Sequence, residues 1–373
     1  MNDKFKFVDM VKIGGAFIAF VIGSGFATGQ ELMQFFTAYG FMGYGAAAVT
    51  LIAFCWFGYT ALKSGSELGF RSDIVIFKYY CGDALGTFFY WFTTVYVVLV
   101  FIIMLAGSGS TLNQFSGLPT IVGRVAMGIL GLITVLMGLN KLVDIIGAIG
   151  PVIIVVSLVV GGISVFNNLD GFAMVNTVLP EANIAAAADN WALSGLLYLT
   201  YQVVCLLPFM LQLSSTTDSK KSAAWGGIFG GVALVAAILL MHSAFLANLS
   251  GVMDKEIPAL YLAEQISPVL ATVFVVIILA GIYTSAIPLM WTFCNRMAKE
   301  HTKKYNILCV AVVVVGILGS ALPFSTLVNL VYPSVGYFGI VVLLCVIYRT
   351  YFKKGDIEKY RKMDEELQKK LEN

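Results

Sequence analysis

A glycine-rich segment followed by an acidic residue is the part of the sequence whose residue types are suited to binding chemistry. It runs from Gly23 to Glu31 and has glycines at positions 23, 25 and 29. Each glycine inside a helix costs about 1 kcal/mol relative to alanine, so we expect the helix to open here. An opened helix leaves amides unpaired at the start of one half and carbonyls unpaired at the end of the other. The segment therefore predicts adjacent sites for an anionic group and a cation.

The composition places this segment in a membrane protein. The 373 residues are 59% hydrophobic and only 12% charged, with a mean hydropathy of +0.88. Apolar stretches of about 20 residues recur, and each is long enough to cross a bilayer as a helix. The net charge of +2 argues against a nucleic-acid partner. The six cysteines and two histidines form no metal-binding or catalytic pattern, so we expect neither an enzyme nor a resident cofactor.

The basic residues predict how the chain is threaded. Ten spans are expected, and short cytoplasmic loops should hold the Lys and Arg residues. The chain is expected in a bacterial cytoplasmic membrane with both termini in the cytoplasm. In this arrangement all Lys and Arg residues except Arg124 and Lys255 fall on the cytoplasmic side. Residues 1–348 then form a single multi-pass transmembrane domain in contact with lipid, and residues 349–373 a charged cytoplasmic tail. The expected spans are about 10–39, 42–62, 86–112, 119–139, 142–166, 190–213, 223–247, 267–293, 305–322 and 328–348.

Two halves of five spans each follow from this count. The halves, about 10–166 and 190–348, begin on opposite sides of the membrane. This arrangement permits an inverted repeat, which is an architecture of many secondary transporters.

The broken first span predicts two kinds of ligand contact and one coupling residue. Amides from Ser24 to Thr28 suit a carboxylate, and carbonyls from Ala19 to Ile22 suit a cation. An acidic residue near mid-membrane, such as Glu31, costs about 2.5–3.5 kcal/mol and is usually functional. Glu31, with Gln30, could stabilise the half-helix, hold the unwound amides or carry a proton. Close packing of helices is the alternative explanation for the glycines.

The same residues resemble a known family. Ile22-Gly23-Ser24-Gly25 resembles the first helix of the amino acid–polyamine–organocation superfamily. The longer string from Gly23 to Glu31 is similar to the YkvI-type family of bacterial amino-acid permeases. The resemblance implies an all-α membrane protein with the LeuT fold, in which ten transmembrane helices form two inverted five-helix repeats. It also implies that helices 1 and 6 are discontinuous.

The resemblance implies a substrate site shared by three spans. In span six a polar and aromatic patch precedes Pro208, although this span lacks a glycine in its middle. In span three, Tyr96 could form an aromatic gate. The implied substrate-binding residues are Gly23, Ser24, Gly25, Phe26, Ala27, Thr28, Tyr96, Thr200, Tyr201 and Gln202.

The resemblance also implies a sodium site between spans one and eight. Residues at i, i+3 and i+4 share one helix face, and in span eight Gly281, Thr284 and Ser285 have this spacing. Their oxygens would complete a Na⁺ site with the carbonyls of Ala19 and Ile22. The alternative is that the two hydroxyls bond within their own helix.

Proton coupling is the rival to sodium. Related proton-coupled permeases carry a lysine in mid-span five, whereas Lys141 and Asp144 lie at the start of this span and the rest is apolar. Glu31 and His242 keep proton coupling open.

The function predicted from these observations is secondary active transport by alternating access. We expect Na⁺-coupled symport of an amino acid or a similar small zwitterion or carboxylate. The alternatives are a proton-coupled permease, or a ligand-sensing receptor of the same fold without net transport. The sequence leaves the identity of the solute and the oligomeric state open.

Overall fold

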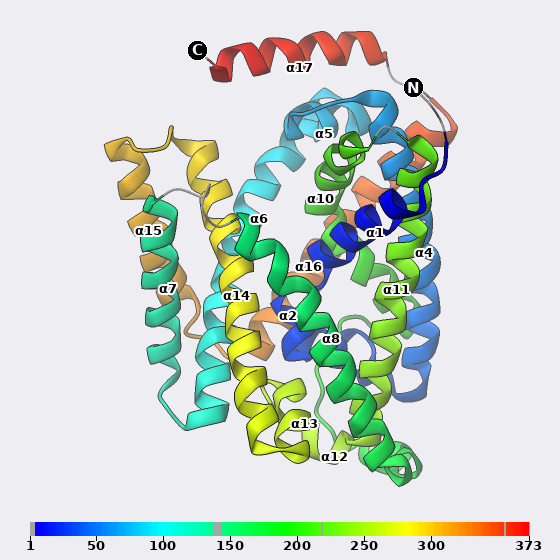
Figure 1. The fold of residues 1–373 in the computed structure, drawn as a ribbon, viewed down its shortest axis with the longest axis vertical. Helices are drawn as coiled ribbons and strands as arrows, with labels where there is room; N and C mark the ends of the chain where they lie inside the picture. Colours follow the sequence, from blue (N-terminus) through cyan, green and yellow to red (C-terminus); the bar gives the residue numbers. More distant parts are fainter. Residues whose placement is uncertain (1–3, 138–142, 218, 354–355, 373) are drawn as a thin grey trace.

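The computed structural model describes residues 4–137, 143–217, 219–353 and 356–372. Within these ranges every regular element is a helix (Figure 1). The longer helices are α1 (Phe7–Val21), α4 (Gly43–Leu68), α6 (Asp83–Ser116), α7 (Thr120–Met137), α8 (Val143–Asn167), α10 (Trp191–Leu213), α11 (Lys220–Ala247), α14 (Pro268–Met297), α15 (Lys303–Gly319), α16 (Phe324–Tyr351) and α17 (Ile357–Glu372). The shorter ones are α2 (Ser24–Thr28), α3 (Gln30–Phe35), η1 (Thr37–Met42), α5 (Asp73–Cys81), η3 (Leu169–Met174), α9 (Val175–Val178), η4 (Ser214–Thr216), α12 (Leu249–Val252) and α13 (Pro258–Ile266).

The chain is a multi-pass membrane protein. In the described part, seven helices are long and apolar enough to cross a membrane, and a pair bent by 78°, Val152–Asn167 with Leu169–Val178, makes an eighth. The interrupted α1 and the 17-residue α15 fall short of that length. Large apolar side chains such as Ile52 and Leu130 are exposed on the outside of the bundle, as lipid contact requires. The count of ten spans in two repeats stays a prediction.

The break predicted in the first span is present at Ile22 and Gly23. α1 ends at Val21, and Gly23 is extended (φ −96°, ψ −161°) before α2 begins. A second interruption follows at Gly29, whose φ of +83° is left-handed. An added Cβ on Gly29 would lie 2.4 Å from Phe245 Cζ, so glycine is required there for space as well as for conformation. The first span is therefore three short helices that bend twice.

The discontinuity expected in the sixth span is wrong. α10 is one continuous helix from Trp191 to Leu213, with Pro208 inside it. No glycine lies between residues 195 and 208, and polar side chains bond within the helix: Gln202 Nε2 donates to the Tyr198 carbonyl at 3.3 Å. Proline removes its own amide hydrogen bond and crowds the carbonyl four residues earlier, and α10 stays continuous despite both effects.

Tight packing holds the broken span near the middle of the bundle. α1 lies against α11, and α11 lies against α4 (Figure 1). The α4–α11 contact is close because an added Cβ on Gly227 would lie 2.3 Å from the carbonyl carbon of Gly58. The α2 segment contacts α6, α8, α13 and α14, so it is enclosed on several sides.

The two ends of the bundle differ. We call the end that carries α5, α17 and the start of α1 the terminal face, because both chain termini lie there (Figure 1). The other end, with η3, α12 and α13, is the opposite face. On the terminal face α17 lies against α5, where the Asp364 carboxylate accepts hydrogen bonds from the amides of Arg71 and Ser72 at 3.0 and 2.9 Å. The predicted tail thus contains a helix that is docked on the bundle.

Candidate functional site

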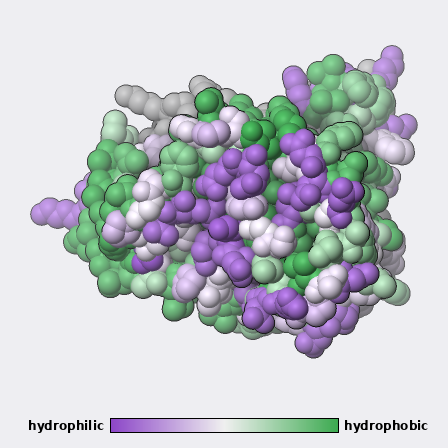
Figure 2. Space-filling model, turned by 90° about the horizontal axis from the view of Figure 1, so that it is seen from below, coloured by the Kyte–Doolittle hydropathy of each residue, from purple (hydrophilic) through white to green (hydrophobic). Residues whose placement is uncertain are grey.

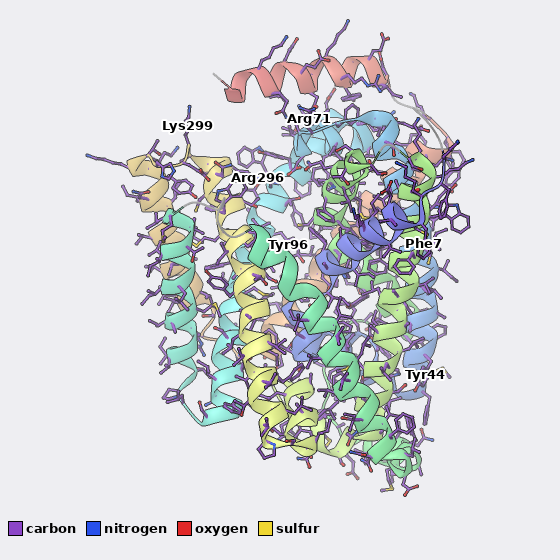
Figure 3. All side chains as sticks on the ribbon, viewed as in Figure 1. Phe7, Tyr44, Arg71, Tyr96, Arg296 and Lys299 are labelled. Carbon is purple, nitrogen blue, oxygen red and sulfur yellow. The ribbon has the colours of Figure 1, made fainter. Side chains whose placement is uncertain are left out.

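The break in the first span opens into a cavity of about 490 Å³. We call it the break cavity. It extends from the break to Asp73, Gln212 and Arg296 near the terminal face; Figure 3 shows Tyr96 deeper in the bundle and Arg296 nearer that face. Its lining residues are Ala19, Phe20, Val21, Gly23, Gly25, Glu31, Asp73, Thr93, Tyr96, Val97, Val100, Met104, Tyr201, Gln202, Cys205, Pro208, Phe209, Gln212, Thr284, Ser285, Pro288, Leu289, Thr292, Arg296 and Tyr332.

Glu31 lies at the deep end of this cavity and folds back onto the break. An added Cβ on Gly25 would lie 1.6 Å from Glu31 Oε1, so the carboxyl group occupies the space that glycine leaves free. Glu31 Oε2 accepts a hydrogen bond from the Tyr201 hydroxyl at 2.9 Å and a longer one from Tyr198 at 3.5 Å. The side chain is 5% exposed. An acidic group of the protein itself therefore lies beside the unwound backbone.

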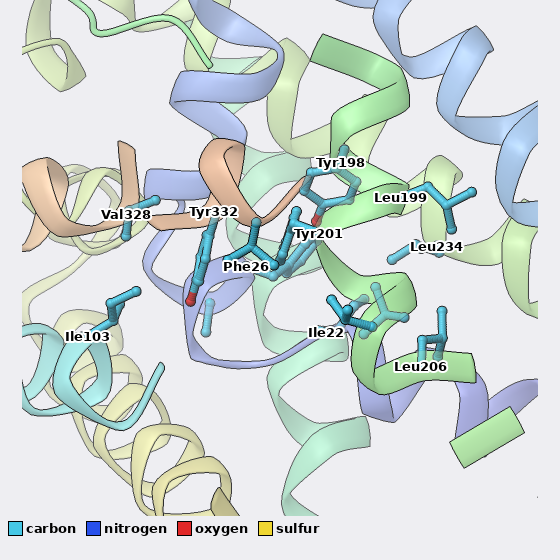
Figure 4. Close-up of a cluster of buried hydrophobic side chains, with 14 of the residues drawn as sticks. Ile22, Phe26, Ile103, Tyr198, Leu199, Tyr201, Leu206, Leu234, Val328 and Tyr332 are labelled. Carbon is cyan, nitrogen blue, oxygen red and sulfur yellow. The ribbon is translucent and has the colours of Figure 1, made fainter. Parts of the chain in front are cut away.

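Tyrosine rings form the wall around this carboxyl group. Tyr201 and Tyr332 are stacked, with centroids 4.7 Å apart and planes at 7° (Figure 4). Tyr96 lines the same cavity from α6 and is buried. Tyr198 is fully buried behind Tyr201, edge to face at 5.7 Å. The deep end of the cavity is thus both aromatic and acidic.

Neutral oxygen atoms border the break at the end of α1 and on α14. In the described chain no backbone amide donates to the carbonyl of Ala19 or Ile22. Thr284 and Ser285 line the cavity, and a Cβ on Gly23 would lie 3.7 Å from Ser285 Oγ. Thr284 Oγ1 donates to the Gly281 carbonyl at 3.0 Å, so its lone pairs stay available. This group of neutral oxygens is chemically suited to a hard cation.

The structure separates the predicted substrate residues into two groups. Gly23, Gly25, Tyr96, Tyr201 and Gln202 line the break cavity. The other residues lie in the protein core, away from the cavity lining: Phe26, Ala27, Thr28 and Thr200, all fully buried.

Other residues named in the sequence analysis lie away from the break cavity or outside the described side chains. The side chains of Ser24, Lys141 and Asp144 lie outside the described residues. Gln30 faces a different cavity from its neighbour Glu31. His242 lines neither cavity: its Nδ1 lies 3.1 Å from Thr37 Oγ1, in the core.

A polar network at the terminal-face mouth of the break cavity was not predicted from the sequence. Arg296 Nη2 pairs with Asp73 Oδ2 at 2.5 Å, Nη1 donates to Thr94 Oγ1 at 3.0 Å, and the guanidinium lies over the Tyr90 ring. Gln212 Nε2 donates to Asp73 Oδ1 at 2.9 Å. These contacts connect α5, α6, α10 and α14. The usable signal in the sequence is a single arginine just after the expected span eight, which the topology argument counts only as a cytoplasmic basic residue.

A second cavity, of about 580 Å³, opens on the opposite face. Figure 2 views that face and shows hydrophilic side chains gathered across its middle. Gln30, Met33 and Gln34 line the cavity from the first span. Three of its lining residues bond to one another. Gln34 Nε2 donates to the Ser325 carbonyl at 2.8 Å. The amide and the hydroxyl of Ser325 each donate to one oxygen of the Glu256 carboxylate, both at 2.9 Å. The consecutive residues Gln30 and Glu31 thus face cavities at opposite ends of the molecule.

Comparison with known proteins supports this picture. No protein-family model matches the chain. Two proteins of Bacillus subtilis strain 168 match it: "uncharacterized membrane protein YkvI", 23% identical over 341 residues, and "uncharacterized protein YyaD", 23% identical over 330 residues. Each alignment covers 88% of this chain and 93% of the relative. The chain is a homologue of YkvI. The resemblance predicted from the string Gly23 to Glu31 is confirmed.

The solved structures that the chain resembles are transporters. An inward-facing form of Mhp1 gives a TM-score of 0.63 at 12% identity, covering 92% of this chain and 77% of Mhp1. A closed form of Mhp1 with bromovinylhydantoin bound, a nucleobase-cation-symport-1 family transporter, gives 0.57 at 15% identity, covering 88% and 77%. A manganese transporter of Eremococcus coleocola gives 0.50 at 15% identity, covering 96% and 75%. At these identities the likeness is one of fold, the LeuT-type fold of Mhp1. These structures are of transporters rather than enzymes, which agrees with the expectation that the chain is not an enzyme.

Proposed function

We propose that the chain is a Na⁺-coupled symporter of an amino acid or a similar small zwitterion or carboxylate. Its fold is that of secondary transporters that work by alternating access. The observation that carries the proposal is the break cavity, which surrounds an interrupted membrane helix and extends toward one face only. The second cavity opens on the other face and is lined by Gln30, the neighbour of Glu31 in the sequence. A solute held at the break would cross the membrane if the packed residues between the two cavities rearranged, so that access from one face closed and access from the other face opened.

The proposed solute site is the deep half of the break cavity. Gly23, Gly25, Tyr96, Tyr201 and Gln202 line it. The volume of about 490 Å³ is within the range of small-molecule sites. Apolar side chains dominate the walls and a few polar groups are available to orient the ligand, which is the usual composition of such sites.

The proposed sodium site is the group of neutral oxygens between α1 and α14. The carbonyls of Ala19 and Ile22 and the hydroxyls of Thr284 and Ser285 would hold the ion, with Gly281 fixing the position of Thr284. Unwound carbonyls of this kind coordinate the coupling ion in transporters with broken helices. Its binding would link the end of α1 to α14 and favour one arrangement of the bundle over the other.

Proton coupling is a second candidate, supported by one observation. Glu31 lines the break cavity and can exchange a proton with water there. His242 lines neither cavity, so this candidate depends on Glu31.

We place the protein in a bacterial cytoplasmic membrane with the terminal face in the cytoplasm. The distribution of Lys and Arg supports this orientation. The break cavity would then be open to the cytoplasm, and the docked α17 would be cytoplasmic.

Uptake by proteoliposomes tests the proposal. A mixture of radiolabelled amino acids should accumulate under an inward Na⁺ gradient and should not when K⁺ replaces Na⁺ on both sides. Thr284→Ala combined with Ser285→Ala should weaken the dependence on Na⁺. Accumulation that follows a pH gradient and ignores Na⁺ would favour the proton candidate. Binding without accumulation under either gradient would indicate a receptor.

A further inference from the structure

The carboxyl group at the break belongs to the protein, and this changes what the site can bind. The notion of an anionic solute at the break assumes that the space beside the α2 amides is free. Glu31 fills that space instead, with its Oε1 where a Cβ of Gly25 would lie. A solute carboxylate approaching the same point would meet a like charge.

Glu31 has no positively charged partner in the described part of the chain. The ion pairs found there join Lys220 to Glu67, Arg296 to Asp73 and Lys359 to Asp83. The partners of Glu31 are the two neutral hydroxyls of Tyr201 and Tyr198, both on Oε2. A carboxylate accepts about four hydrogen bonds, and a buried one without a compensating charge is costly. A cation with several N–H donors would supply both the charge and the hydrogen bonds that Glu31 does not receive from the described protein.

The cavity wall beside Glu31 also favours a cation. Tyr96, Tyr201 and Tyr332 line it, and tyrosine ring faces attract ammonium groups. Val97, Val100 and Met104 continue the wall with apolar surface suited to the body of a small molecule. No Lys or Arg of the described chain lines the cavity except Arg296, which is held at the mouth by Asp73.

We propose that the break cavity recognises a solute through its ammonium group, with Glu31 as the anionic partner and the tyrosine rings as the surrounding cage. This inference rests on the proposed function and narrows its solute class. An amine or an amino acid oriented with its ammonium end at Glu31 fits, whereas a solute whose only charge is a carboxylate does not. Glu31 is thereby assigned to solute recognition.

Pairs of small molecules that share a hydrocarbon skeleton and differ in their charged group provide the test. The pairs are 2-phenylethylamine with 3-phenylpropanoate and butylamine with butanoate, and L-phenylalanine serves as the zwitterion. Binding to the purified full-length protein is measured by calorimetry and by the shift in melting temperature, in Na⁺ and in K⁺ buffers, up to about 10 mM. At least one amine should bind, and its matched carboxylate should bind at least about tenfold more weakly.

Two variants show whether Glu31 is responsible. Glu31→Gln keeps the shape and removes the charge, and should weaken amine binding at least about tenfold, since the ammonium group then faces a neutral acceptor in place of a carboxylate. Glu264→Gln is the control, because this half-buried carboxyl on α13 lines neither cavity and its loss removes the same charge. Glu264→Gln should bind the amine like the unchanged protein.

The outcomes separate this inference from the proposed function. Carboxylates that bind as tightly as their amines, amines that bind Glu31→Gln unchanged, or no amine bound at all would each overturn the inference. Amine binding that requires Glu31, in a protein that moves no solute in proteoliposomes, would support the inference and refute transport. Transport of carboxylates alone would support the proposed transport function and refute this inference.

Discussion

Replacing Gly25 by alanine tests the position of Glu31 most sharply. The two residues fit together because glycine has no Cβ. An added Cβ would lie 1.6 Å from Oε1, 2.3 Å from Cδ and 2.8 Å from Cγ of Glu31, all closer than real Cβ contacts come. The carboxyl group must therefore move away from the break and from the Tyr201 hydroxyl.

The size of the effect follows from the contact that is lost. The hydrogen bond from Tyr201 to Glu31 is 2.9 Å long, and bonds of this type to charged groups contribute about 1.5–3 kcal/mol. Alanine in a helix recovers up to about 1 kcal/mol relative to glycine. With the full recovery, we expect a net loss of about 0.5–2 kcal/mol in the free energy of unfolding. Because the anionic partner is displaced as well, amine affinity should fall about 10–100-fold.

Calorimetric binding and chemical unfolding in mixed micelles measure these two quantities. Gly15→Ala is the matched control, because Gly15 is an exposed residue of α1 whose added Cβ meets nothing within 4 Å. It should bind the amine normally and be no less stable. In a background of Glu31→Gln, Gly25→Ala should add little further loss of affinity, since neighbours that act through one contact are not additive. Equal behaviour of the alanine variants at positions 25 and 15 would refute the geometry.

Three further changes test the polar contacts near the two faces. Glu256→Ala removes both hydrogen bonds to Ser325 and should speed amide hydrogen exchange in α13 by about tenfold or more, since each bond contributes about 1.5–3 kcal/mol. Unchanged exchange would contradict the inference that these bonds hold α13 in place. Asp364→Ala removes the two bonds to the α5 amides and should speed proteolytic release of α17, whereas Glu365→Ala, at an exposed neighbouring position, should not. Arg296→Lys keeps the charge but loses the forked geometry that reaches three partners, so exchange in α5 should increase. If α5 exchanges as slowly in that variant as in the unchanged protein, the Arg296 network at the mouth of the break cavity is not what holds α5 in place.

Local sequence predicted the break because helix propensity is a local property. The glycines at 23 and 29 fall at the two interruptions of the first span. In span six the residues were a better guide than the resemblance: the absence of glycine, noted in the sequence, explains why α10 stays continuous.

The orientation of side chains around the break could not be predicted, because it depends on contacts between distant elements. Glu31 turns back onto Gly25 only because Gly29 bends the chain between them. Phe26, Ala27 and Thr28 are in the predicted segment but are fully buried in α2, which packs against α6, α8, α13 and α14.

The polar contacts near the two faces could not be predicted from the sequence either. Gln34 and Ser325 are 291 residues apart, and Arg296 and Asp73 are 223 apart. Each of these residues alone resembles an ordinary polar residue near a helix end. Their meaning depends on the fold that brings them together.

Accessibility of two thiols tests alternating access at the break most directly. Cys205 lines the break cavity, and Met33 lines the second cavity with 2% of its surface exposed. In a chain with Met33→Cys and the other native cysteines replaced, a membrane-impermeant thiol reagent is applied with and without Na⁺ and solute. The account predicts that the labelling rates at positions 205 and 33 change in opposite directions, each with the reagent on its own side. Rates that rise together would indicate a continuous pore, and rates that do not respond to Na⁺ or solute would contradict a transporter.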